Sequence, residues 1–119
     1  MVQSGAAGSS RRTLWALRGQ QAIDEAGDVV AVATPGHTRD HISVVVEDPG
    51  TTFFLAGDTS YDERLMLAGR LDGVSADDDV AGATLRAIRH LAKNRPTVYL
   101  PTHDPESAAR LASRSLAAA

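Results

Sequence analysis

The sequence predicts a layered α/β or α+β fold in which one mixed sheet packs against helices. Two observations predict it: short apolar and β-branched runs that end at turn residues, and longer stretches with apolar residues at helical spacing. With 119 residues, the chain has a common size for a single domain, so two independent cores are not expected. We assign residues 1–20 to a disordered or loosely attached segment and residues 21–119 to the folded domain.

Three apolar runs in the first half of the chain are predicted strands. VVAVA (29–33) is rich in β-branched residues and is followed by a Pro-Gly turn dipeptide. ISVVVE (42–47) places Ile42, Val44 and Val46 on one face and is closed by the turn sequence Asp-Pro-Gly. TFFLA (52–56) is apolar on both faces, as in a strand that is covered on both sides. Residues 42–56 therefore predict a hairpin.

Helical patterns dominate the second half. DERLMLAG (62–69) predicts one or two helical turns, and a longer helix follows with Ser75 as its N-cap and three aspartates in its first turn. We expect this helix to end before Pro96, with its arginines and lysine facing outward. TVYLP (97–101) predicts a further strand, and PESAARLASRSL (105–116) predicts a final amphipathic helix.

The N-terminal residues carry weaker signals. Residues 1–12 are small, polar and then basic, without periodicity, which predicts disorder. Trp15 and Leu17 belong to a stretch that predicts only a short strand or turn.

Composition excludes several classes of protein. The net charge of −3 argues against a nucleic-acid or membrane-surface partner, because both require a concentrated basic face. The absence of cysteine excludes disulfides and thiolate metal sites, so any metal must be held by His, Asp or Glu. The apolar runs are far shorter than the roughly 20 residues that span a bilayer. We therefore expect a cytoplasmic protein.

Three polar residues follow predicted strands closely. His37 comes after VVAVATPG, Asp58 after TFFLAG and His103 after TVYLPT. If the strands lie side by side, these side chains project from one edge of the sheet, and Gly36 and Gly57 allow tight turns just before two of them. Two imidazoles and a carboxylate at one edge suit zinc or another borderline divalent ion.

Other interpretations stay open for each residue taken alone. A histidine in a loop is usually solvated, and an aspartate after a glycine at a strand end is commonly a turn residue. The same placement three times favours a metal site. We expect His90, on the arginine-rich side of the long helix, to be solvated, and His41 to brace the His37 loop through its ring nitrogens.

The segments TPGHTRDHISV, FFLAGDTSY and TVYLPTHDPES occur in the order found in metallo-β-lactamase-fold hydrolases and resemble the C-terminal half of that family. The likeness covers about residues 25–115 and is greatest to the N-acyl-homoserine lactonase branch. The resemblance implies the C-terminal half of an αββα sandwich, with one mixed sheet packed against helices.

The resemblance also implies roles for individual residues. His37 matches a ligand of one zinc ion, Asp58 matches the aspartate that bridges two metals, and His103 matches a ligand of the second. Tyr61 stands three residues after Asp58, where the lactonases have a tyrosine that contacts the substrate carbonyl. The candidate catalytic residues are thus Asp58 and Tyr61, and the candidate metal ligands are His37, Asp58 and His103.

The chemistry that the resemblance implies is metal-assisted hydrolysis of an ester, lactone or amide carbonyl. The metal would polarise the carbonyl, and Tyr61 would stabilise the developing oxyanion. The implied cofactor is Zn²⁺, one or two ions, and the implied partner is a small-molecule ester or lactone.

One departure from the family is large. The HxHxDH motif, which supplies four further metal ligands from the N-terminal half, does not occur in this sequence, and no histidine precedes His37. His37 and Asp58 then remain at one metal position, and Asp58 and His103 at the other. The chain is expected to be a truncated half-fold.

A half-fold would leave one face of its sheet bare. Phe53, Phe54, Leu55 and the valines of 42–46 would form an apolar patch large enough to drive association. Three hypotheses follow: a shortened metallo-hydrolase with little or no activity, a half-domain that binds one divalent ion and retains weak hydrolysis, or an interaction module. Such a module would pair with another copy or with a separate chain that carries the missing N-terminal half.

Overall fold

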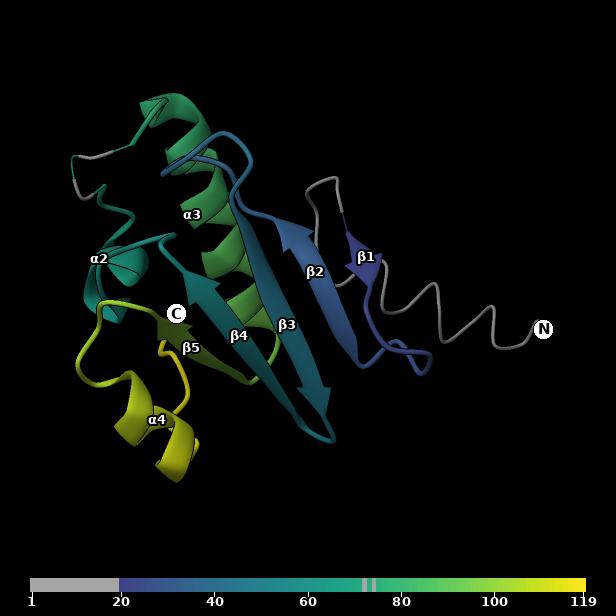
Figure 1. Cartoon of the computed structure of the whole chain (residues 1–119). Coiled ribbons are helices and arrows are strands. Elements are labelled where there is room, and N and C mark those ends of the chain that lie inside the picture. The colour runs from purple at the N-terminus through teal and green to yellow at the C-terminus, as the bar shows by residue number, and fades with distance from the viewer. Residues whose placement is uncertain (1–19, 72, 74) are drawn as a thin grey trace.

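The computed structural model describes residues 20–71, 73 and 75–119, in which five strands form one sheet of order β1-β2-β3-β4-β5 (Figure 1). The strands are β1 (Gln21–Ala22), β2 (Val29–Ala33), β3 (Ile42–Asp48), β4 (Thr51–Gly57) and β5 (Thr97–Pro101). The helices are α2 (Glu63–Ala68), α3 (Asp78–Asn94) and α4 (Ser107–Ser113). The expectations for residues 1–12, for Trp15 and for Leu17 lie outside the described residues.

The sheet is mixed, which confirms the predicted fold class. Neighbouring strands from β1 to β4 pair antiparallel, and β5 joins β4 in parallel. The predicted hairpin is present as β3 and β4, with Val44 opposite Leu55 and Val46 opposite Phe53. Gly50 closes it with φ of 82°, a left-handed conformation that glycine adopts without steric cost.

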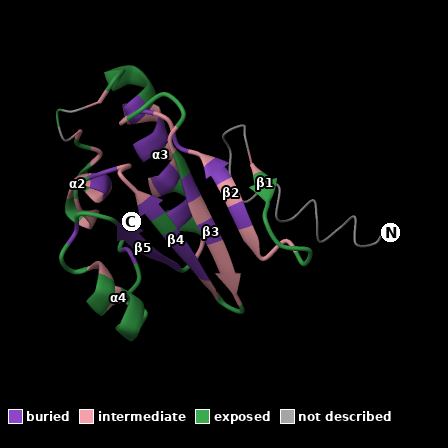
Figure 2. Ribbon diagram, in the orientation of Figure 1, coloured by how far each residue is buried: buried purple, intermediate pink, exposed green. Residues whose placement is uncertain are grey.

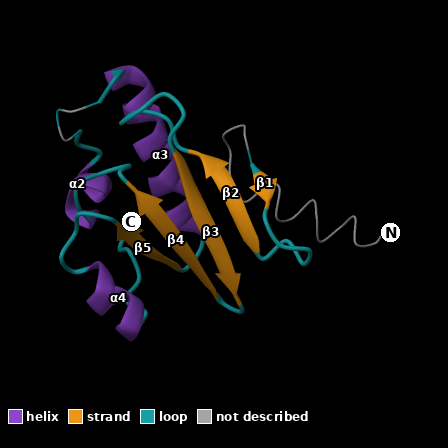
Figure 3. Cartoon of the chain, viewed as in Figure 1, coloured by secondary structure: helices purple, strands orange, loops and turns teal. Residues whose placement is uncertain are grey.

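This topology places three strand ends at one edge of the sheet. Because β2 and β4 are both antiparallel to β3, and β5 is parallel to β4, the strands β2, β4 and β5 run in the same direction. Their carboxyl ends therefore share one edge, where the arrowheads of β2 and β4 point to the same side (Figure 3). The loops that follow these strands carry His37, Asp58 and His103.

The core lies between the sheet and α3. Leu85, Ile88 and Leu91 are buried on one side of α3, at the spacing that places residues on a single helix face. They pack against alternate residues of the strands, and Figure 2 shows buried segments on both partners. The strand residues of this cluster are Val30, Val32, Val45, Phe54, Ala56 and Tyr99.

Two helix boundaries differ from the sequence prediction. Asp77, and not Ser75, is the N-cap of α3, because its carboxylate accepts hydrogen bonds from the backbone N–H groups of Asp79 and Val80. The backbone N–H of Ala76 donates instead to the carbonyl of Gly36, which holds this segment outside the helix. α4 is also shorter than the predicted 105–116.

The sheet face opposite α3 is less exposed than expected. Phe54 does not lie on it at all, since this side chain is fully buried in the core. Phe53 does lie there, but the guanidinium of Arg114 stands 5.2 Å from its ring centroid and the side chain is only 9% exposed. Among the described residues, the large apolar side chains that are exposed on this face are Ile42, 58% exposed, and Leu55, 41% exposed.

None of the helices in the described ranges is long and apolar enough to cross a membrane.

Candidate functional site

The carboxylate of Asp58 lies between two imidazoles at the edge where β2, β4 and β5 end. Its Oδ2 atom is 3.8 Å from Nε2 of His37, and its Oδ1 atom is 3.2 Å from Nε2 of His103. The ring of Tyr61 stacks on that of His103, with centroids 5.7 Å apart and an interplanar angle of 15°. The structure thus brings together all four residues that the sequence indicated, and each imidazole faces a different carboxylate oxygen.

Two glycines fix the backbone just before His37 and Asp58, as expected. Gly36 has φ of 151° and is pressed against the start of α3, where a β-carbon would come within 2.7 Å of the backbone of Ala81. Gly57 has φ of 63°, and a β-carbon there would stand 2.9 Å from Nε2 of His41. Neither position has room for a side chain, so both loops depend on glycine.

His41 connects Asp58 to the sheet through a directional chain of hydrogen bonds. The hydroxyl of Ser43 donates to the carbonyl of Ala56 at 3.0 Å, so it accepts from the hydroxyl of Thr34, 2.8 Å away. That hydroxyl in turn accepts from Nδ1–H of His41 at 2.9 Å, which leaves Nε2 to accept the backbone N–H of Asp58 at 3.0 Å.

The expected bracing role of His41 is therefore present, directed at the Asp58 loop as well as at Thr34 before the His37 loop. Burial lowers the pKa of His41, and the neighbouring carboxylate of Asp58 offsets only part of this effect. Since the ring accepts a hydrogen bond from a backbone N–H, the neutral form is the one that the geometry requires.

Tyr99 holds the loop that carries Asp58 and Tyr61. Its buried hydroxyl lies 2.6 Å from the Thr59 hydroxyl and 2.7 Å from the Ser60 hydroxyl. Ser60 donates its own proton to the carbonyl of Asp62, so Tyr99 donates to Ser60 and accepts from Thr59. Burial raises the pKa of Tyr99 to about 12, so its hydroxyl remains protonated at neutral pH.

Asp104 anchors the loop that carries His103. One carboxylate oxygen accepts the backbone N–H of Glu63 at 2.9 Å and the guanidinium of Arg110 at 2.8 Å. The other oxygen accepts the backbone N–H of Glu106 at 2.8 Å. One buried carboxylate thereby joins the His103 loop to the starts of α2 and α4.

The environment of this cluster favours the charged form of Asp104. Burial alone would raise its pKa, but the two backbone N–H donors and Arg110 outweigh that effect and lower it. Burial raises the pKa of Glu63, which lies on the other side of the same guanidinium.

The donor atoms at the edge suit a divalent ion, but their number does not complete a site. Nδ1 of His37 and Oδ1 of Asp58 are buried atoms without a hydrogen-bond partner, since the contact of that oxygen with His103 lacks hydrogen-bond geometry. Imidazole nitrogen and carboxylate oxygen are ordinary zinc ligands. Within residues 20–71, 73 and 75–119, however, no three His, Asp or Glu side chains are arranged to hold one ion. Each side of Asp58 offers two ligands.

Some residues of this edge were not predicted from the sequence. Thr34, Ser43 and Tyr99 lie inside apolar runs, where nothing local distinguishes a hydroxyl that bonds across the sheet. Asp104 carries a signal that was available, because an Asp-Pro pair directly after His103 is typical of a turn anchored by its carboxylate. His90 is exposed on α3, as expected, and takes no part in this site.

The family model of the metallo-beta-lactamase superfamily matches residues 3–103 of the chain. No curated protein matches the chain.

Solved structures with a similar fold include N-acyl homoserine lactone hydrolases. One, bound to the product N-hexanoyl-L-homoserine at its catalytic metal centre, has a TM-score of 0.66 and 20% identity, covering 78% of this chain. A mutant of B. thuringiensis AiiA bound to N-decanoyl-L-homoserine gives the same three values. A quorum-quenching N-acyl homoserine lactone hydrolase has a TM-score of 0.63 at 20% identity over 76% of this chain. The chain spans only 36% of the length of each of these three structures.

Proposed function

Because the chain belongs to the metallo-beta-lactamase superfamily, we propose that it supplies one side of a zinc centre that hydrolyses an ester or lactone. His37, Asp58 and His103 are its ligands, and Tyr61 contacts the substrate. The observation that carries the proposal is the position of Asp58, which presents one carboxylate oxygen to each imidazole. This arrangement suits two ion positions that share one aspartate.

The ligand count defines what else the centre requires. Catalytic zinc sites usually have three protein ligands and one open position, whereas each position here has two. Residues 1–19 contain no His, Asp, Glu or Cys. That segment therefore supplies none of the further ligands that each position requires.

The residues of this chain have distinct roles in the proposed reaction. Zinc, when bound, would polarise the substrate carbonyl and lower the pKa of water. Tyr61 is 56% exposed and stacks on His103, so its hydroxyl is available to donate a hydrogen bond to the carbonyl oxygen as negative charge develops there. The hydrogen bond from the backbone of Asp58 to His41 keeps the shared carboxylate in place.

Zinc binding to the purified chain tests the ligand assignment. We expect calorimetry to give measurable affinity, with a larger loss for Asp58→Ala than for His37→Ala or His103→Ala, because only Asp58 serves both positions. His90→Ala is the matched control, since this exposed histidine lies on α3. Equal affinity in the Asp58→Ala and His90→Ala proteins would refute the assignment.

Lactone hydrolysis tests the proposed substrate class. With N-hexanoyl-homoserine lactone and zinc, we expect the chain alone to be at most weakly active, and any activity to fall about tenfold or more in Tyr61→Phe without a change in zinc affinity. Activity that is unchanged in Tyr61→Phe would remove this tyrosine from the reaction. If the wild-type rate equals that of buffer, the chain contributes ligands without being a hydrolase by itself.

A second candidate function is association through the sheet face opposite α3. Ile42 and Leu55 are both exposed there, and they are diagonal neighbours because Leu55 pairs with Val44. The partner would be a second copy or a complementing half of the fold. We expect light scattering at high concentration to detect association that Leu55→Lys abolishes and Leu111→Lys does not. Leu111 is the control because it is similarly exposed, at 51%, on α4. A wild-type chain that remains monomeric would exclude association with itself.

A further inference from the structure

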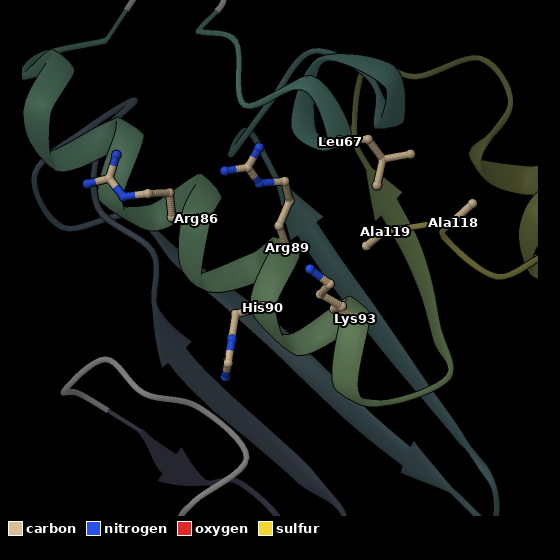
Figure 4. A pocket seen from close by; sticks show the side chains of 7 residues that line it. All are labelled: Leu67, Arg86, Arg89, His90, Lys93, Ala118 and Ala119. Carbon is tan, nitrogen blue, oxygen red and sulfur yellow. The ribbon is translucent and has the colours of Figure 1, made fainter.

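The outer side of α3 contains a cavity that does not belong to the candidate metal site. Its volume is about 440 Å³, within the range of small-molecule pockets, and its walls come from α3, α2 and the C-terminal residues (Figure 4). The lining residues are Leu67, Arg86, Arg89, His90, Lys93, Ala118 and Ala119.

The α3 wall of the cavity is basic because of its helical spacing. At about 3.6 residues per turn, Arg86, Arg89, His90 and Lys93 fall within roughly 100° of the helix circumference. In Figure 4 Arg89 points toward α2 and Leu67, Lys93 lies on the same side, and His90 points the other way. The buried side of α3 faces the sheet, and among the described residues α2 and the C-terminal residues line the cavity beside this basic side.

In the described part of the chain, no carboxylate forms an ion pair with the Arg or Lys side chains of this cavity. Arg95, Arg110 and Arg114 each form an ion pair with a carboxylate. Within the described part of the chain, Arg86, Arg89 and Lys93 form none. Three unpaired cations around one hollow therefore leave a local positive charge in a chain whose net charge is −3.

Arg89 is held at the cavity by its contact with α2. Its guanidinium lies against the backbone of Gly69, where a β-carbon would come within 2.7 Å of Nη1. Gly69 is the left-handed C-cap of α2. The absence of a side chain there lets the backbone end the helix and leaves room for the guanidinium of Arg89.

We propose that this cavity binds the phosphate group of a small molecule that also has an apolar portion. Guanidinium groups match phosphate oxygens in pairs, and Lys93 adds a third positive charge. Leu67 and Ala118 supply the apolar wall opposite the cations. The phosphate is carried either by a soluble ester or by a lipid headgroup, and the two sources share this chemistry.

Amide chemical shifts in an NMR titration measure the binding. With inorganic phosphate and with butyl phosphate as probes, we expect saturable shifts confined to residues 86–93 and to the end of α2. Butyl phosphate should bind several-fold more tightly, because its chain removes apolar surface from water. Shifts spread over all cationic surfaces of the protein, or the absence of saturation, would overturn the proposal.

Matched charge variants separate a defined site from general attraction. Arg89→Gln and Lys93→Gln should each weaken butyl phosphate binding about tenfold. Arg39→Gln removes the same charge from an exposed loop and should leave binding within twofold. All three positions are partly or fully exposed, so circular dichroism should show unchanged folding. An equal loss in Arg39→Gln would overturn the proposal.

Vesicle sedimentation identifies the source of the phosphate. Binding to phosphatidic acid vesicles that Arg89→Gln abolishes, and that phosphatidylserine vesicles of equal charge do not show, would assign the cavity to a lipid monoester headgroup. Binding to the soluble esters alone would assign it to a metabolite. Equal binding to both kinds of vesicle, unaffected by Arg89→Gln, would mean charge attraction without a site.

Discussion

At the edge where β2, β4 and β5 end, the residues that face outward and the residues behind them are held in different ways. Within the described residues, the ring nitrogens of His37 and His103 approach only the carboxylate of Asp58, at distances or angles that do not make hydrogen bonds. The side chain of His103 is 57% exposed. Behind them, His41 and Tyr99 use every polar atom of their side chains in hydrogen bonds of 3.0 Å or shorter.

The difference separates two tasks that one side chain cannot perform together. A residue that must bind a ligand has to keep its polar atoms available, which costs stability when they are buried. A residue that positions a loop has to use its polar atoms within the protein. In this fold the loops are fixed by the inner residues, so the outer ones remain free, and substitutions should separate the two groups.

The largest loss of stability is expected for Asp104→Ala. The change removes three hydrogen bonds and leaves Glu63, at 3.6 Å, as the remaining carboxylate beside Arg110. We expect the free energy of unfolding to fall by about 3 kcal/mol in urea denaturation. Glu106→Ala, in the same loop but exposed and without a side-chain cap bond, should change it by less than about 0.5 kcal/mol. Similar effects of the two substitutions would contradict an anchoring role for Asp104.

Gly57→Ala should have the next largest effect. An alanine would have to adopt φ of 63° and place its β-carbon 2.9 Å from Nε2 of His41. We expect a loss of about 2 kcal/mol together with altered NMR shifts of the His41 ring. Gly50→Ala measures the cost of the left-handed backbone alone, because φ there is 82° and no atom lies within 4 Å of the added carbon. If both variants lose the same stability and the His41 shifts stay unchanged, the contact with His41 is not important.

Tyr99→Phe should cost about 1.5 kcal/mol at pH 7, because the hydroxyls of Thr59 and Ser60 lose their partner. The effect should also depend on pH. Tyr99 has a pKa of about 12 in the folded protein against the ordinary 10.0, so the folded state holds the proton more tightly than the unfolded state does. The contribution of the Tyr99 hydroxyl to the free energy of unfolding is therefore present below pH 10 and is lost as pH rises toward 12.

Urea denaturation between pH 7 and 11 measures this dependence. The difference in the free energy of unfolding between the wild type and Tyr99→Phe should become smaller as pH passes 10. The free energy of unfolding of Tyr61→Phe, a change at an exposed position, should equal that of the wild type throughout. A gap that stays constant would show that Tyr99 titrates alike in both states.

The smallest effect on stability is expected for His103→Ala. This side chain makes no hydrogen bond within the described residues, so we expect a change below about 0.5 kcal/mol. The same substitution should lower zinc affinity if the proposed ligand role is correct. A stability loss comparable to that of Asp104→Ala would erase the distinction between the outer and inner residues.

Local patterns explain how much of the fold could be predicted. The β-branched run of β2 and the turn after β3 depend on neighbouring residues, and both agree with the structure. The convergence of His37, Asp58 and His103 could also be anticipated, because it requires only that three strands run in one direction.

The remaining features depend on contacts between distant parts of the chain. Tyr99 meets Ser60 across 39 positions, and Phe54 turns toward α3 although its neighbour Phe53 faces the other side. The Ser75 prediction was wrong because the loop at Gly36 binds Ala76 and delays the helix. The basic cavity was foreseen only as an outward-facing side of α3, since its other walls come from α2 and the C-terminal residues.

The parallel pairing of β4 with β5 has a consequence for the order in which the edge assembles during folding. His37 and Asp58 are brought together by two successive antiparallel hairpins, whose ends are close in sequence and can meet early. We expect His103 to arrive later, because α2 and α3 lie in the connection that returns the chain to β4, and closing this longer loop carries a larger entropic cost. The two sides of Asp58 should therefore form at different times during folding, with the His103 side last.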